Sequence, residues 1–330
     1  MPKALITGGA GFIGGHLTRR LLDQGWTVDL VDNLSRGVKD EMVAELEAHP
    51  SFALHIADLR DPASLTNIGT DYTHVFHFAA LLGVQNVIDR PQEVLRHNVS
   101  MLETMLDVAA AQSDLQRFLF PSTSEVYVGT QQQFELPIPS PETTPLAVSP
   151  LDAPRTSYML SKIYGEALCH HSGLPFTIIR PHNFYGPRMG LSHVIPQLSQ
   201  RIRDAADGDE LVVYSIDHRR TFCFIDDAID YVVALLATDE AVGGTFNIGT
   251  QEPEITMGAL AQLLCGIVGR DLSIVAGETH AGSPPRRAPD MTHTDAVSRH
   301  RAQVSLLDGA TRTYEWYRTN VFEGDGLSAT

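Results

Sequence analysis

Hydroxyl and carboxyl side chains gather directly behind a hydrophobic run near the middle of the chain. The apolar stretch Phe118–Phe120 is followed, after one proline, by Ser122, Thr123, Ser124 and Glu125. A strand that only had to pack would continue with apolar or turn residues instead. These residue types could bind a polar ligand and exchange protons with it. Ordinary solvation of a strand end is the alternative.

A second pair of reactive side chains is Tyr158 and Lys162, at positions i and i+4. On a helix, residues at this spacing lie on one face, so the phenol and the ammonium group point the same way. A nearby positive charge stabilises the phenolate and lowers the pKa of the phenol, which makes Tyr158 a usable base or acid. The spacing alone is common, and a solvated pair is the alternative.

Three glycines near the start of the chain have the spacing of a nucleotide-binding turn. Gly8, Gly11 and Gly14 follow an apolar run and open a helical pattern. Gly8 allows a tight turn, Gly11 lets the backbone approach a pyrophosphate at the positive end of the helix, and Gly14 lets helix and strand pack closely. A tight turn without a ligand is the alternative.

Acidic residues follow the next two predicted strands. Asp32 lies roughly 20 residues after the glycines, where a carboxylate can accept hydrogen bonds from both hydroxyls of an adenosine ribose. Because Asp32 would repel a 2′-phosphate, the sequence predicts NAD rather than NADP, although Arg36 keeps NADP open. Asp58 and Leu59 could hold the adenine, and a polar strand end is the alternative.

Strand-like apolar runs alternate with helical patterns through the first half of the chain. The runs are Lys3–Thr7, Trp26–Asp32, Phe52–Asp58, His74–Ala80, Arg117–Ser122 and Phe176–Pro181, and the helical patterns are Phe12–Gln24, Val94–Ala111 and the stretch from Tyr158. Such alternation predicts an α/β fold, a Rossmann-type doubly wound parallel sheet with helices on both faces. Beyond about Asn183 the pattern loosens. We expect this domain at residues 1–182 and a smaller, interleaved α/β lobe at 183–330.

Composition narrows the class of partner. The formal net charge is −16, whereas nucleic acids and anionic membranes require a basic face, so we expect neither as a partner. The 3 cysteines form no CxxC pair, which fits a reduced, cytoplasmic protein. The 14 histidines show no metal-ligand spacing, so we expect no metal. No apolar run approaches the roughly 18 residues of a membrane span, and we expect no leader peptide.

A set of motifs extends in one order along nearly the whole chain: GxxGxxG, HFAA, STSEVY, YxxxK, RPHNFYGPR, RTFCFIDD and RRAPD. In this order they resemble the extended short-chain dehydrogenase/reductase family, which includes NAD-dependent nucleotide-sugar epimerases, dehydratases and decarboxylases. The resemblance implies a Rossmann domain that binds NAD. It also adds further residues to those expected to contact the cofactor: Phe12, Ile13, Asn33, Ala79 and Ala80.

The resemblance implies roles for the reactive side chains as well. Thr123 would hydrogen-bond the C4 hydroxyl of a nucleotide sugar, Tyr158 would take its proton, and Lys162 would hold the cofactor ribose and tune Tyr158. NAD+ would accept the C4 hydride, which leaves a 4-keto sugar. Ser124 and Glu125 would lie beside the reacting carbons. A non-catalytic NAD-sensing protein is the competing class, but such a protein has no need of an activated phenol.

The reaction that follows C4 oxidation differs among members of the family. The Thr-Ser-Glu segment at 123–125 resembles uronate decarboxylases and mannose-type dehydratases, because glucose-type 4,6-dehydratases usually have aspartate in its middle. The proline-arginine pair before Tyr158 and the RRAPD motif also resemble decarboxylases. The loop LLGVQNVIDRP resembles 4-epimerases, and Val128 stands where the family usually has glycine. The best reading is UDP-glucuronate decarboxylation; a UDP-glucose or UDP-glucuronate 4-epimerase and a nucleotide-sugar 4,6-dehydratase are the alternatives.

Arginines must balance the charge of an anionic substrate in this acidic protein. The resemblance implies that Asn183, Arg220 and Arg287 contact the diphosphate or the sugar, and a guanidinium fork suits phosphate or carboxylate. A surface salt bridge is the alternative for each arginine.

We also expect a homodimer that pairs the helix at 94–111 with the Tyr158 helix. This expectation comes partly from the resemblance and partly from apolar positions on the first helix: Met101, Leu102, Met105, Leu106 and Val108. The alternative is that these positions pack on the sheet.

Overall fold

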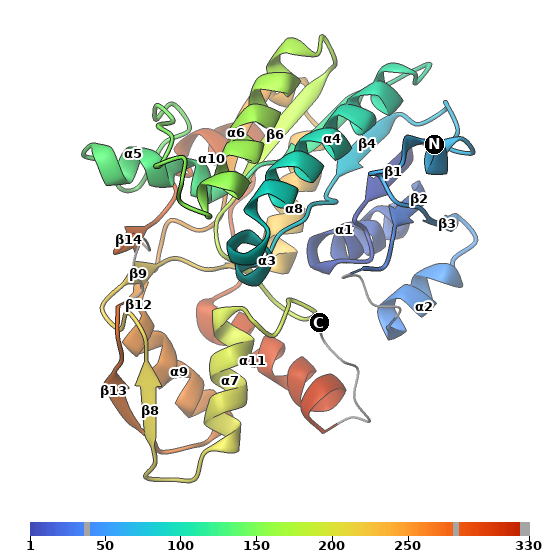
Figure 1. Cartoon of the computed structure of the whole chain (residues 1–330). Coiled ribbons are helices and arrows are strands. Elements are labelled where there is room, and N and C mark those ends of the chain that lie inside the picture. Colours follow the sequence, from blue (N-terminus) through green and yellow to red (C-terminus); the bar gives the residue numbers. More distant parts are fainter. Residues whose placement is uncertain (36–39, 280–283, 324–330) are drawn as a thin grey trace.

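The largest element of the fold is a seven-stranded sheet, with a smaller lobe below it in Figure 1. The computed structural model describes residues 1–35, 40–279 and 284–323, so Arg36 lies outside the described residues. All strands of the sheet are parallel, in the order β11-β6-β5-β4-β1-β2-β3. Their bounds are β1 Lys3–Thr7, β2 Thr27–Asp32, β3 Phe52–Ile56, β4 His74–His77, β5 Arg117–Pro121, β6 Phe176–Pro181 and β11 Gly244–Ile248.

Helices cover both faces of this sheet. The helices of the chain are α1 Phe12–Asp23, α2 Glu41–Glu47, α3 Val84–Asp89, α4 Pro91–Ala110, α5 Val128–Gln133, α6 Thr156–His171, α7 Val194–Asp204, α8 Ile225–Leu236, α9 Met257–Val268, α10 Thr292–Ser298 and α11 Leu306–Tyr317. Leu5 and Phe118 belong to a core that includes residues of α4 and α6, whereas Ala4, Ile6 and Leu119 pack in a core with α1 and α8. Successive strand residues point to opposite faces, so the continuous apolar runs fill two cores.

The glycine turn joins β1 to α1. Gly8 has a φ of +68°, and a Cβ there would lie 2.5 Å from the backbone nitrogen of Ala79. A Cβ on Gly14 would lie 2.5 Å from the Cα of Gly9. Glycine is therefore required for the backbone conformation at the first position and for close packing at both.

The chain after β6 contributes to both parts of the molecule. The lower lobe contains α7, α9 and α11 together with short strands: β8 Glu210–Val213, β9 Arg219–Arg220, β12 Ile255–Thr256, β13 Ser273–Ala276 and β14 Arg286–Arg287. The remaining short strands, β7 Phe184–Tyr185 and β10 Cys223–Phe224, pair with each other. By contrast, β11 pairs along the edge of β6, and α8 packs in the core with α1. These returning elements interleave the two parts.

Helices α4 and α6 lie side by side on one face of the sheet (Figure 1). Met101, Leu102 and Met105 of α4 are buried in the core beneath the helix, and Leu106 and Val108 are partly buried against it. Packing within one chain accounts for these apolar positions, so they give no argument for a dimer. The homodimer stays a prediction from the resemblance.

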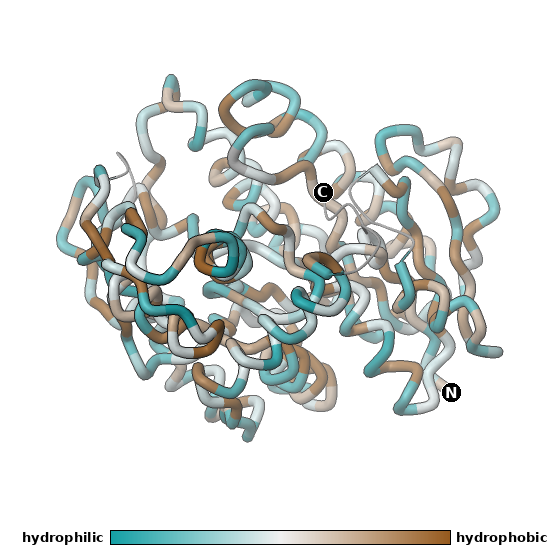
Figure 2. Tube along the Cα trace, turned by 90° about the horizontal axis from the view of Figure 1, so that it is seen from below, coloured by the Kyte–Doolittle hydropathy of each residue, from teal (hydrophilic) through white to brown (hydrophobic). Residues whose placement is uncertain are grey.

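Hydrophobic and hydrophilic stretches alternate along the coloured part of the trace (Figure 2). Within residues 1–35, 40–279 and 284–323, no helix has both the length and the apolar character that are needed to cross a membrane.

Candidate active site

A cavity of about 750 Å³ opens where the parallel strands end and the lower lobe begins. Open α/β sheets bind their ligands in a crevice at this place, outside the carboxyl ends of the strands. The predicted residues that line the cavity are Gly8, Gly11, Phe12, Ile13, Gly14, Asp32, Asn33, Asp58, Leu59, Ala79, Ala80, Thr123, Ser124, Glu125, Asn183 and Arg287. Tyr158, Lys162 and Arg220 are not among its lining residues. The structure thus brings most of the predicted site together around one space.

The first turn of α1 faces this cavity with no side-chain cap. The helix begins at Phe12, and its N-cap is Gly11, which makes no side-chain hydrogen bond. The first amides of a helix have no carbonyl partner within the helix, and the helix dipole adds positive charge at this end. A pyrophosphate fits such a place, because it can accept hydrogen bonds from these amides.

Asp32 links the glycine turn to the loop after β2. Its Oδ2 accepts a hydrogen bond from the amide of Ala10 at 3.1 Å, and its Oδ1 accepts one from the amide of Leu34 at 2.8 Å. Burial raises the pKa of Asp32, and these two hydrogen bonds oppose that shift. Each carboxylate oxygen keeps a further lone pair, so Asp32 can still accept bonds from ribose hydroxyls.

Asp58, predicted to hold the adenine, lines the cavity. Arg60 donates to its two oxygens at 2.9 and 3.1 Å through Nε, and Asn33 donates through Nδ2 at 3.3 Å. The hydrogen bonds from Arg60 hold the pKa of Asp58 well below its usual range. The carboxylate is therefore ionised at neutral pH and fixed in place.

The Thr-Ser-Glu segment lies directly after β5. Thr123 caps a short 3₁₀ turn, Ser124–Tyr127, by accepting a hydrogen bond from the amide of Glu125 at 3.2 Å. The hydroxyl proton of Thr123 stays available for a ligand. Ser124 accepts a hydrogen bond from Nη1 of Arg287 at 3.5 Å. The cap explains why threonine suits the first position of the segment.

Tyr158 and Lys162 lie on α6, as the spacing predicts. The Nζ atom of Lys162 lies 5.8 Å from the centre of the Tyr158 ring and donates a hydrogen bond to the carbonyl of Pro121 at 2.7 Å. Burial lowers the pKa of Lys162 to about 8. Pro121 is the last residue of β5, so this hydrogen bond connects α6, which carries Tyr158 and Lys162, to the strand that directly precedes the Thr-Ser-Glu segment.

A buried ion pair between β6 and α6 holds the residue that directly follows β5. Arg180 of β6 donates to both oxygens of Glu166 of α6, at 2.9 and 2.7 Å, and Ser122 donates to Glu166 at 2.5 Å. Both charged side chains are less than a tenth exposed. The first hydroxyl of the polar group at 122–125 therefore serves the scaffold, and only the following residues face the cavity.

Two of the predicted substrate arginines are neighbours in a small sheet. Arg220 of β9 lies opposite Arg287 of β14 in a parallel pair. Burial lowers the pKa of Arg220 to about 10, and the positive charge of Arg287 adds to this shift. Burial also lowers the pKa of Arg287, while Glu125 opposes the shift. Two adjacent guanidinium groups favour an anion between or beside them.

Comparison with known proteins identifies the family of this chain. The model of the NAD dependent epimerase/dehydratase family matches residues 4–249. The chain belongs to this family. A UDP-N-acetyl-alpha-D-glucosaminuronate decarboxylase of Bacillus cytotoxicus is 33% identical to it, over 96% of this chain and 98% of the relative. The UDP-glucuronic acid decarboxylase 1 of Arabidopsis thaliana is 30% identical, over 98% of this chain and 72% of the relative.

Solved structures agree with this membership. The dTDP-glucose 4,6-dehydratase of Streptomyces venezuelae, solved with NAD bound, has a TM-score of 0.83 and 27% identity, over 96% of this chain and 97% of its own. The predicted family and doubly wound α/β fold are confirmed. This member of the epimerase/dehydratase family is an enzyme, and its cofactor is NAD.

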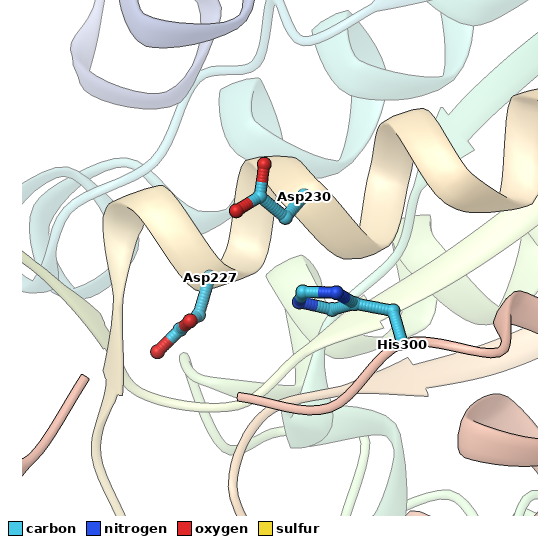
Figure 3. A group of neighbouring side chains, drawn as sticks. All are labelled: Asp227, Asp230 and His300. Atoms are coloured by element: carbon cyan, nitrogen blue, oxygen red, sulfur yellow. The ribbon is translucent and has the colours of Figure 1, made fainter. Parts of the chain in front are cut away.

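One group of side chains in the described part of the chain could offer ligand atoms to a metal ion: Asp227, Asp230 and His300, whose ligand atoms lie within 4.8 Å of one another (Figure 3). Asp227 already accepts hydrogen bonds from the amides of Gln303 and Val304, each at 2.9 Å. Asp230 forms an ion pair with Arg20 of α1. Because the guanidinium of Arg20 places a positive charge at Asp230 and two amides already hold Asp227, we assign the group to the packing of α8 and not to a metal.

Several residues of the cavity were not predicted from the sequence. Arg188 and Asp40 line it as an ion pair, and Trp316 and Tyr317 reach it from α11. Arg188 belongs to the RPHNFYGPR motif, so its family context was a usable signal. No local pattern marks Asp40 or the two aromatic residues, because only the fold brings them to the glycine turn.

Proposed function

We propose that this enzyme decarboxylates a UDP-linked uronic acid, with UDP-glucuronate as the substrate. The observation that carries the proposal is the position of Arg287, whose Nη1 lies 3.5 Å from Ser124 Oγ in a wall that also contains Glu125. A guanidinium fixed beside these residues can bind a carboxylate on the sugar ring. The names of two similar proteins, both uronate decarboxylases, support the same reaction.

The first chemical step takes place at C4 of the sugar. Thr123 hydrogen-bonds the C4 oxygen, and Tyr158 takes the hydroxyl proton as the C4–H bond breaks. Bound NAD+ supplies the acceptor for the hydride. Lys162 stabilises the phenolate of Tyr158 by its positive charge. The C4 hydroxyl has then become a ketone.

The ketone makes the C6 carboxylate part of a β-keto acid. The C5–C6 bond breaks, carbon dioxide leaves, and the electron pair of that bond moves into an enolate with the C4 oxygen. Glu125, directly or through a water molecule, gives a proton to C5, and Arg287 orients the ring during these steps. Release at this stage gives the 4-keto form of the UDP-pentose; return of the hydride to C4, with a proton from Tyr158 to the C4 oxygen, would give the UDP-pentose itself.

The two parts of the chain divide the binding work in this proposal. Residues 1–182 bind NAD, and residues 183–330 mostly bind the nucleotide sugar, with Asn183, Arg220 and Arg287 at the diphosphate and sugar. Asn183 lines the cavity, and its Nδ2 donates to the carbonyl of Thr221 at 2.9 Å, which fixes its side chain near Arg220. Arg220 and Arg287 pair across β9 and β14.

We propose further that the enzyme is a cytoplasmic homodimer. All three cysteines are free and buried, which suits a reducing compartment. Tyr164 on α6 is 45% exposed, beside the neighbouring helix α4, which leaves aromatic surface for a partner subunit. Light scattering at several concentrations should give twice the mass of the chain, and a concentration-independent monomer would reject the dimer.

The competing reaction is C4 epimerisation of a UDP-sugar. The loop that resembles 4-epimerases contributes Leu81, Leu82, Asn86 and Arg90 to the cavity, so it is in a position to influence the reaction. In an epimerase the ketone is reduced on its other face and Glu125 has no proton to deliver. The two reactions therefore differ in carbon dioxide release and in their need for Glu125.

The deciding experiment incubates the enzyme and NAD+ with UDP-glucuronate, UDP-N-acetylglucosaminuronate and UDP-glucose, and follows product mass and carbon dioxide. We expect carbon dioxide from a uronate. The variant Glu125→Gln should slow its release while NAD+ binding stays normal, and Glu135→Gln, which changes an exposed glutamate ten positions further along the chain, should behave as wild type. If C4 epimers form without carbon dioxide and Glu125→Gln is nearly normal, the enzyme is an epimerase.

A further inference from the structure

The segment Pro187–Met189 fastens the start of the lower lobe to the NAD-binding domain. The carbonyl oxygen of Pro187 lies 3.0 Å from Nε2 of His16 on α1. The carbonyl oxygen of Met189 accepts a hydrogen bond from the hydroxyl of Tyr317 on α11. Arg188, between these two contacts, has a φ of +70°, an uncommon conformation for a residue with a side chain. The segment is thus held from both sides, with one side chain directed toward the glycine turn.

Arg188 contacts the glycine turn through both Nη atoms of its guanidinium group. Nη2 donates to the carbonyl of Ala10 at 3.1 Å, and Nη1 lies 3.4 Å from the carbonyl of Gly11. A Cβ on Gly15 would collide with Nη1, so the second glycine of the pair at 14 and 15 makes room for this arginine. Only 6% of the Arg188 side chain is exposed. The contact is therefore a built part of the turn.

Asp40 balances the charge of this guanidinium. Its Oδ2 accepts a hydrogen bond from Nε of Arg188 at 2.5 Å, and its Oδ1 caps α2 by accepting from the amide of Val43 at 3.1 Å. The Asp40 side chain is 10% exposed. With its charge met by Asp40, Arg188 can stay buried beside the turn, and its two Nη atoms are directed at the backbone carbonyls.

These contacts act on the side of the turn opposite to its amides. The carbonyl of Gly11 and the amide of Phe12 belong to one peptide group, and Phe12 is the first residue of α1. A charged donor on the carbonyl polarises that peptide and strengthens its N–H as a donor to an anion. A glycine-rich turn can adopt several backbone conformations. The contacts from Arg188 can therefore also favour the one conformation that binds the cofactor.

We propose that Arg188 is a positioning residue for NAD, which holds and polarises the glycine turn from the lower lobe so that the first amides of α1 meet the cofactor pyrophosphate. The cofactor site then depends on a residue outside the NAD-binding domain. This role is independent of which sugar the enzyme converts, and NAD binding alone can test it.

The test is the dissociation constant of NAD+ for nucleotide-free protein, measured by calorimetry. Arg188→Met removes both carbonyl contacts, and we expect NAD+ to bind about tenfold more weakly. Arg20→Met is the matched control, because Arg20 also forms an ion pair from α1 to a later element, Asp230 of α8, but lies in the last turn of α1, at the other end of the helix from the glycine turn. Both variants should melt earlier than wild type, but only the first should lose NAD+ affinity.

Adenosine separates positioning from a general loosening of the site, because it has no pyrophosphate. Its affinity should change much less than that of NAD+ in Arg188→Met. If Arg188→Met fails to fold, Arg188→Lys can be used in its place, because lysine keeps a positive charge beside Asp40 but lacks the two Nη donors. Arg188→Lys should also reduce the affinity for NAD+ more than the affinity for adenosine. Unchanged NAD+ affinity, an equal loss for adenosine, or an equal loss in Arg20→Met would overturn the proposal.

Discussion

Replacement of Lys162 by methionine should stabilise the folded protein and abolish most of its activity. Lys162 is 5% exposed, and burial lowers its pKa from 10.5 to about 8. At 1.36 kcal/mol for each unit of pKa, the buried ammonium destabilises the folded state at pH 7 by about 3 kcal/mol. Methionine has a similar length and no charge, but it leaves the carbonyl of Pro121 without this donor, which costs about 1 kcal/mol. The expected gain in unfolding free energy is therefore about 2 kcal/mol.

The pH dependence identifies the cause of this gain. Between pH 8 and 10.5 the unfolded wild type binds more protons than the folded wild type, because its lysine has the higher pKa. Wild-type stability should therefore rise across this range relative to Lys162→Met, and the advantage of the variant should vanish toward pH 10.5. Urea unfolding without nucleotide, followed by tryptophan fluorescence at pH 7 and pH 10, measures the difference. A variant that is less stable at pH 7, with a difference that does not change with pH, would refute the reasoning.

Other perturbations address the cofactor and the phenol. Tyr158→Phe should keep its fold and its NAD+ affinity while turnover falls by about 10²- to 10⁴-fold, the usual effect of losing a general base; wild-type turnover would remove Tyr158 from the mechanism. The wild type should bind NAD+ more tightly than NADP+ in calorimetry, because Asp32 would repel a 2′-phosphate, and equal affinities would contradict the role of Asp32. Arg287→Met should weaken binding of UDP-glucuronate more than binding of UDP, because only the former has a carboxylate; an equal loss would place Arg287 at the diphosphate.

The local sequence was sufficient to predict those features of the site that depend on residues close together in the chain. The glycine turn, the spacing of Tyr158 and Lys162, and Asp32 at the end of β2 depend on neighbours along the chain, and the structure has them as expected. The strands of the parallel sheet are buried on both faces, so they appear in the sequence as continuous apolar runs, and these runs predicted the sheet. These are the cases in which residue type limits the backbone directly.

Long-range contacts could not be predicted in the same way. Glu166 reads as a polar residue on a helix, and its burial depends on Arg180, which comes from the following strand. Arg188 and Asp40 are 148 positions apart in the chain and meet only beside the glycine turn. The apolar positions of α4 were open to two interpretations, because a sequence does not say whether a hydrophobic stripe meets the sheet or another subunit.

The edge strand β11 has a consequence for how the molecule forms during synthesis. When β6 leaves the ribosome, its outer edge has no partner, because Gly244–Ile248 is still to be made. An unpaired edge of a parallel sheet is open to wrong strand pairing, and contacts between distant parts of a chain form slowly. The seven-stranded sheet is therefore incomplete until α7, β8 and β9 of the lower lobe and then β11 have emerged. Truncation at residue 182 should yield an aggregating fragment and not an independent domain.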